Sequence, residues 1–95
     1  MDFIDFIASV DAAAPPAQLS SALQALWHDR RGDWHAAHNA AQAQNDQHGA
    51  WVHAYLHRKE GDLSNAHYWY QRANKPAAST SLDEEWEAIV RALLG

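Results

Sequence analysis

The stretch AWVHAYLHRKEGDLSNAHYWYQRANKP, residues 50–76, decides the fold that this sequence predicts. Apolar residues recur every three or four positions on both sides of Gly61-Asp62, which is the spacing of a buried helix face. Gly61 can adopt the left-handed conformation that ends a helix, and the Asp62 carboxylate can accept hydrogen bonds from the first turn of the next helix. Pro76 cannot continue a helical hydrogen-bond ladder. The stretch therefore predicts two helices joined by a tight turn.

A weaker copy of this hairpin lies 29 residues upstream, where LWHDRRGDWHAAHNAAQ aligns with YLHRKEGDLSNAHYWYQ. Gly32 and Asp33 align with Gly61 and Asp62, and the apolar positions of the leading helix repeat as well. A fixed period of this size is typical of stacked helical hairpins, because one hairpin cannot bury its apolar face alone. The sequence thus predicts an all-α fold built on two short hairpins.

The second hairpin resembles a tetratricopeptide repeat. Gly61-Asp62-Leu63 is similar to the turn of that family, and a small residue (Ala66), an aromatic residue (Tyr70), Ala73 and the terminating Pro76 follow in the family's order. The same segment also resembles small bacterial proteins of this kind that carry no assigned function. The resemblance implies an α-α superhelix whose leading helices line a groove.

The chain departs from that family at several positions. Its period is shorter than the usual ~34 residues, Trp51 lies one residue closer to the turn than the family pattern has it, and Pro76 comes early. In the first copy, Ala41 and Gln44 occupy the aromatic and alanine sites. These departures indicate a shortened, divergent member of the superfamily.

A single domain, residues 1–95, is expected to contain about six helices. The predicted parts are an N-terminal helix over 2–12, the hairpins over 17–45 and 47–75, and a C-terminal capping helix over 81–94. Within the first hairpin, the leading helix is expected from about Ala17 to Arg31. Ser81 and Glu84 have the spacing of a capping box at the start of the last helix.

Large apolar side chains surround most of the predicted N-terminal helix: Phe3, Ile4, Phe6, Ile7 and Val10. Such a helix needs a partner surface. Three arrangements are open, since the helix can cap the first hairpin, lie in the groove, or join a second subunit.

Composition narrows the classes of partner. The net charge of −5 repels phosphate, so we expect no nucleic-acid partner. No stretch is long and apolar enough to span a membrane, no secretion signal is present, and cysteine is absent, all of which favour a cytoplasmic protein.

Histidines are the candidate metal ligands, since the chain has seven of them. His53 and His57 are four residues apart and can hold one ion through two imidazoles, and His35 and His38 are spaced by three. Two ligands do not complete a site, so no cofactor is expected and a histidine-based metal or pH sensor is kept as an alternative function. No serine lies in a GxSxG motif, which leaves a small hydrolase as an unsupported alternative.

Protein contact without catalysis is the function that the sequence predicts. By the family resemblance, the groove side chains include Trp51, Tyr55, Arg58 and Lys59, with Arg58 and Lys59 supplying positive charge. These residues are candidates for binding an acidic peptide or chain terminus. Self-association into a homo-oligomer is the other form of contact, and the identity of the partner stays open.

Overall fold

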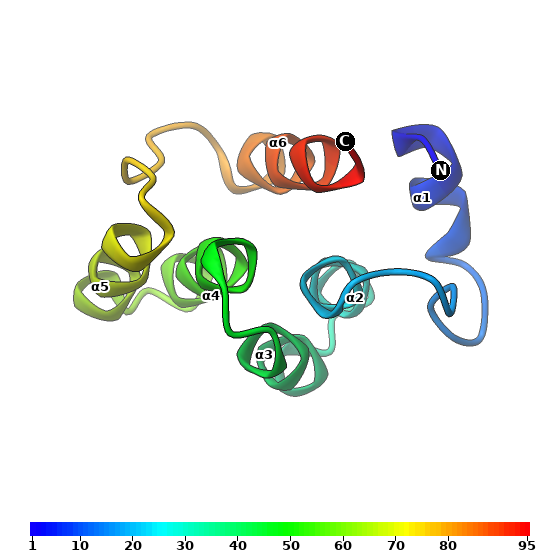
Figure 1. Cartoon of the computed structure of the whole chain (residues 1–95), viewed down its shortest axis with the longest axis horizontal. Coiled ribbons are helices and arrows are strands. Elements are labelled where there is room, and N and C mark those ends of the chain that lie inside the picture. Colours follow the sequence, from blue (N-terminus) through cyan, green and yellow to red (C-terminus); the bar gives the residue numbers. More distant parts are fainter.

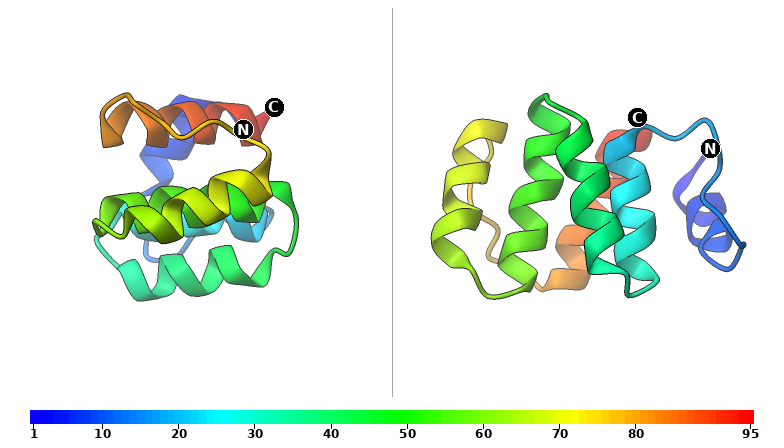
Figure 2. Two further views of the ribbon diagram at one scale, coloured as in Figure 1. Left: turned by 90° about the vertical axis from the view of Figure 1, so that its left-hand side faces the viewer. Right: turned by 90° about the horizontal axis from the view of Figure 1, so that it is seen from below.

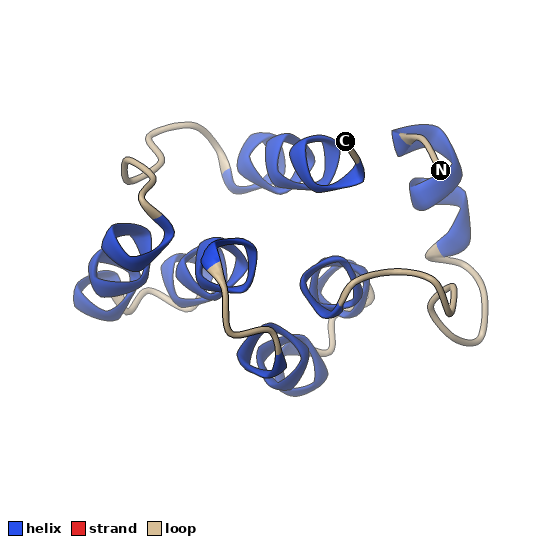
Figure 3. Ribbon diagram, in the orientation of Figure 1, coloured by secondary structure: helices blue, strands red, loops and turns tan.

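All of the regular structure in this chain is helical (Figures 1 and 3). The computed structural model describes residues 1–95. The helices are α1 (Phe3–Ser9), α2 (Ser21–Arg30), α3 (Trp34–Ala43), α4 (Gln47–Lys59), α5 (Leu63–Ala73) and α6 (Leu82–Leu94). The all-α class and the number of six helices are confirmed.

Both predicted turns have the expected glycine conformation and the expected aspartate cap. Gly32 and Gly61 have φ values of 81° and 87°, a conformation that residues with a Cβ atom rarely adopt. The following aspartates, Asp33 and Asp62, accept hydrogen bonds from the backbone N–H groups of α3 and α5. The capping box at Ser81 is also present.

Two helix boundaries differ from the prediction. The N-terminal helix ends at Ser9 instead of residue 12, and the leading helix of the first hairpin begins at Ser21 instead of Ala17. Before it, the Leu19 N–H donates to the carbonyl of Pro16 in a turn, and the Ser20 hydroxyl accepts from the Leu23 N–H. The serine cap thus sets the start of α2, because it supplies the first-turn acceptor that residues 17–19 lack.

Helices α2 to α5 form a row in which each helix contacts the next (Figures 1 and 2). Helix α6 does not extend this row beyond α5. It packs across α2 and α4 and buries Trp86, Ile89 and Val90 there. The Trp86 Nε1–H donates to the carbonyl oxygen of Leu26 at 3.0 Å. The face formed by α2 and α4 is therefore covered by the chain's own last helix.

The N-terminal helix lies beside α6. Phe6 is fully buried, and the rings of Phe3 and Phe6 lie 6.0 and 5.8 Å from the Trp86 ring. The Trp27 Nε1–H on α2 donates to the Ser9 carbonyl, which fixes the end of α1. One face of α1 is thus buried within the chain, while Ile4 on the other face is 75% exposed. None of the helices combines the length and apolar composition required to cross a bilayer.

Candidate metal centre

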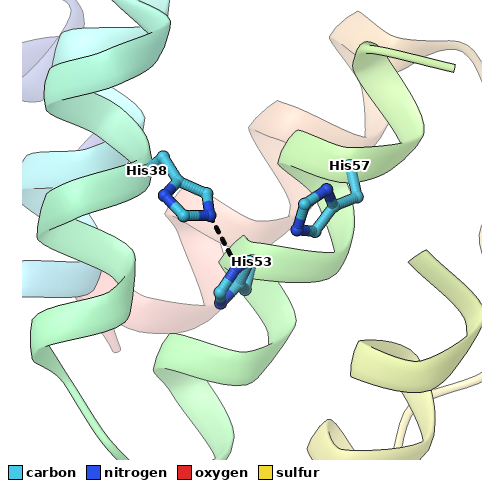
Figure 4. Close-up of side chains that lie close together, drawn as sticks. All are labelled: His38, His53 and His57. Carbon is cyan, nitrogen blue, oxygen red and sulfur yellow. Dashed lines mark hydrogen bonds between the residues drawn. The ribbon is translucent and has the colours of Figure 1, made fainter. Parts of the chain in front are cut away.

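Three histidines from two neighbouring helices converge at the contact between the hairpins (Figure 4). His38 comes from α3, and His53 and His57 come from consecutive turns of α4. One ring nitrogen from each histidine lies within 4.8 Å of the other two. The Nε2 atoms of His38 and His53 are 2.9 Å apart and share a hydrogen bond.

Close packing of α3 on α4 brings these side chains together. Ala37 and Ala41 on α3 are fully or almost fully buried. A Cβ atom at Gly49 would lie 1.8 Å from the Gln44 carbonyl oxygen, so only glycine permits this approach. Because the two helices are antiparallel, residues at similar distances from the loop around Asn45 face each other. His38 and His53 are such a pair.

Two indole rings flank the cluster. The Trp34 ring stacks on His38 with centroids 4.9 Å apart and an angle of 18°, and the Trp69 ring stacks on His53 at 3.9 Å and 14°. His53 and His57 are buried, with 4% and 8% exposure, while His38 is partly exposed. The indoles hold two of the imidazoles in fixed orientations.

Burial keeps the imidazoles of His38 and His53 neutral at physiological pH. It lowers the pKa of His53 to about 4, with the charges of His38 and His57 acting in the same direction. The pKa of His38 is also lowered, first by burial and then by the charge of His57. A neutral imidazole retains a lone pair, which is the form that binds metals.

Glu60 orients the third ring. A carboxylate can only accept, so the 2.7 Å contact between His57 Nδ1 and Glu60 Oε1 places the proton on Nδ1. In the neutral form of the ring, the lone pair of His57 is then on Nε2. A carboxylate bound to the far nitrogen of a ligating histidine is a common outer-shell arrangement in metal sites, where it fixes the tautomer and raises ligand basicity.

The distances are compatible with a tetrahedral ion after small side-chain rotations. Ligand bonds of ~2.0–2.1 Å place two nitrogens ~3.3 Å apart, which lies between the 2.9 Å of the closest pair and the 4.8 Å upper limit. When an ion binds both Nε2 atoms, the proton shared by His38 and His53 would move to Nδ1 of the ring that carries it. Three imidazoles would leave one coordination position for another ligand.

A second possible ligand group, His57, Glu60 and Asp62, shares His57 with the first. Its other members have structural roles. Glu60 orients His57, and the Asp62 carboxylate accepts from the N–H and side-chain amide of Asn65 at the start of α5. The three-histidine group is therefore the stronger candidate.

Sequence reasoning named two of the three clustered histidines, as an alternative metal site. It paired His53 with His57 by helical spacing and paired His38 with His35, but His35 is exposed and lies outside the cluster. The link between His38 and His53 depends on the packing of α3 against α4. Their similar distance from the connecting loop is the signal that could have revealed it.

The predicted groove residues have partners inside the chain. Lys59 Nζ and the Tyr55 hydroxyl both contact the buried carboxylate of Asp29, at 2.9 and 2.8 Å. Burial, and next the Asp29 charge, raise the pKa of Tyr55. These two residues hold α4 against α2.

Arg58 and Trp51, also on α4, have partners in the segments that follow it. Arg58 donates to the buried Glu85 carboxylate of α6 at 2.8 Å and to the Thr80 carbonyl. The Lys75 ammonium lies 4.3 Å from the centre of the Trp51 ring. A peptide bound to the four predicted residues would have to compete with α6 and with these internal contacts.

Comparison of the chain with protein-family models, with curated proteins and with solved structures found no match in any of the three. Among the chain's features, the histidine cluster has the most specific chemistry, because it combines three converging imidazoles with an orienting carboxylate.

Proposed function

We propose that this protein binds a transition-metal ion of the zinc class through His38, His53 and His57. The observation that carries the proposal is the convergence of three ring nitrogens within 4.8 Å of one another. Imidazole nitrogen suits zinc, copper, iron and nickel, and the absence of cysteine leaves histidine as the main nitrogen or sulfur ligand. This proposal develops the metal-sensor alternative and adds His38 to its ligand set.

Binding would join the two hairpins, because the ligands come from α3 of the first and α4 of the second. A ligand bound only by the folded chain stabilises it by about 2.7 kcal/mol when its concentration is a hundred times Kd. Zinc should therefore raise the melting temperature of the protein.

Thermal unfolding with and without excess zinc tests this proposal. We expect a clear rise in melting temperature for the wild type and little or no rise for His53→Gln. A matched control replaces the exposed histidines His35 and His67 with glutamine and should respond like the wild type. The absence of a shift in the wild type, or an equal shift in His53→Gln, would exclude the site.

Protein contact is the second candidate function, with a second copy of this chain as the partner. Helices α1 and α5 lie at opposite ends of the molecule (Figure 1). Each exposes large apolar side chains, which are Ile4 and Ile7 on α1 and Leu63 and Tyr68 on α5. Residues 1–11 carry three aspartates and no basic side chain, whereas residues 63–75 carry Arg72 and Lys75 and no acid. The opposite charges favour head-to-tail association over binding of an unrelated peptide.

Family membership is a further part of the proposal. The repeated glycine-aspartate turns and the antiparallel hairpins support a divergent tetratricopeptide-like origin. A cytoplasmic protein of bacterial type agrees with the absence of cysteine and with the resemblance of residues 50–76 to small bacterial proteins.

A further inference from the structure

A cleft of about 240 Å³ adjoins the histidine cluster. It lies between the end of α3, the first turns of α4 and the last turn of α5, and His53, Trp69 and Arg72 contribute to its lining. A water molecule occupies ~30 Å³ in the liquid, so the cleft has room for a small ligand together with solvent. One of the proposed metal ligands thus belongs to the wall of a ligand-sized cleft.

Arg72 brings an unneutralised positive charge to this cleft. Its guanidinium lies 5.4 Å from the Trp69 ring centre and 5.7 Å from that of Tyr68, and its Nη1 donates to the Tyr68 hydroxyl at 3.2 Å. It forms no salt bridge, although Arg30, Arg58 and Arg91 all do. Most of its N–H donors are therefore free, and stacking on aromatic rings leaves them available for a planar anion.

The only carboxylate in the cleft lining is that of Asp46. It accepts from the Gly49 N–H and from the Gln44 side-chain amide at the N-terminus of α4. The positive end of the helix dipole lies at this point and offsets its charge. Asp46 is therefore committed to the helix cap, and Arg72 has no acidic partner in the cleft.

Trp69 contacts both the histidine cluster and Arg72, since its ring stacks on His53 and also lies beneath the Arg72 guanidinium. Three imidazoles leave one coordination position open on a tetrahedral ion. We propose that a small oxyanion occupies this position and is held at its other end by Arg72. The inference rests on the proposed metal site and adds the class of its exchangeable ligand.

Cobalt-loaded protein tests the inference, because the visible absorption of Co²⁺ changes when its coordination changes. Acetate and phosphate should each alter the cobalt bands of the wild-type protein, whereas neutral acetamide should not. Arg72→Gln should bind cobalt normally but bind each anion about tenfold more weakly, which corresponds to about 1.4 kcal/mol. Arg72→Lys should recover part of the affinity, since it keeps the charge and loses the planar donors. Arg91→Gln, on an exposed face of α6, should behave like the wild type.

The outcomes separate the two proposals. Cobalt binding without a response to either anion overturns the inference and leaves the metal site intact. The inference is also overturned if Arg72→Gln binds the anions as tightly as the wild type does, because the arginine would then not contribute to recognition. A response of the wild type to acetamide as large as its response to acetate would overturn it as well. A failure of the wild type to bind cobalt overturns both proposals. Circular dichroism of the variants checks that they are folded.

Discussion

Glu60 has a defined role at the scale of single residues, because it accepts the Nδ1 proton of His57. Removal of such an outer-shell carboxylate typically lowers metal affinity by about 10- to 100-fold. We expect Glu60→Gln to weaken zinc binding by an amount in this range, measured by isothermal titration calorimetry, without loss of the fold. Glu87→Gln, at an exposed pair with Arg91, is the matched control. Unchanged affinity in Glu60→Gln would contradict the orienting role.

His53 makes the metal-free protein sensitive to mild acid. Its pKa is lowered to about 4 by burial, whereas an unfolded histidine titrates near ~6.5. Between these values the unfolded chain binds a proton that the folded chain does not, so stability is present above pH ~6.5 and is lost as the pH falls. The lowered pKa of His38, the partner that faces His53, acts in the same direction.

Between about pH 7 and pH 5, this shift should lower the free energy of unfolding by about 2 kcal/mol through His53. Urea denaturation in the presence of a chelator measures the change. His53→Gln should show a shallower pH dependence, because glutamine does not titrate. If wild type and variant lost the same stability over this range, His53 would not be the group responsible.

At the scale of helices, the contact between α3 and α4 creates the histidine cluster. The alanines of α3 and Gly49 of α4 remove the side-chain bulk that would separate the two backbones. His38 and His53 can then share a hydrogen bond across the contact. Helical spacing predicted the pair on α4, but it carries no information on which residue of a neighbouring helix faces that pair.

Helix α6 changes the role of the basic residues at the end of α4. Its Glu85 is buried and accepts from Arg58 and from the Tyr70 hydroxyl, so it links α6 to both α4 and α5. Burial, followed by the hydrogen bond to Glu85, raises the pKa of Tyr70, which keeps the hydroxyl protonated as a donor. The cation that appeared free for a partner in sequence reasoning is thus paired within the chain.

For the whole molecule, the radius of gyration of 12.1 Å is close to the ~12.4 Å expected of a compact domain with 95 residues. An open superhelix with an empty groove would be more extended. The surfaces open to other chains are therefore at the ends of the molecule, where α1 and α5 expose apolar side chains. The segment around α1 is acidic, and the segment around α5 is basic.

Head-to-tail association should depend on concentration and weaken with salt, because screening reduces the attraction between the acidic and basic ends. Light scattering coupled to size exclusion measures the mass. Ile4→Glu should lower the apparent mass of any oligomer, whereas Asn39→Glu adds the same charge on the exposed face of α3 and should leave the mass unchanged. A monomer at all concentrations would rule out this candidate function.

Local chemistry in the sequence determined the helices and their turns. Gly32 and Gly61 could be read as helix ends and Ser81 as a cap, because these properties depend on residues a few positions apart. The start of α2 was misplaced because Pro15-Pro16 indicated an earlier beginning, whereas the turn before Ser20 delays it.

Only the tertiary structure decided which helix covers the face of α2 and α4, and which histidine completes the pair on α4. Both outcomes depend on how side chains far apart in the chain share buried volume. Trp86 occupies the space beside Leu26, 60 residues away, and Gly49 lets α3 approach α4. Helical periodicity shows that a face must be buried, but the partner that buries it is selected by packing across the whole molecule.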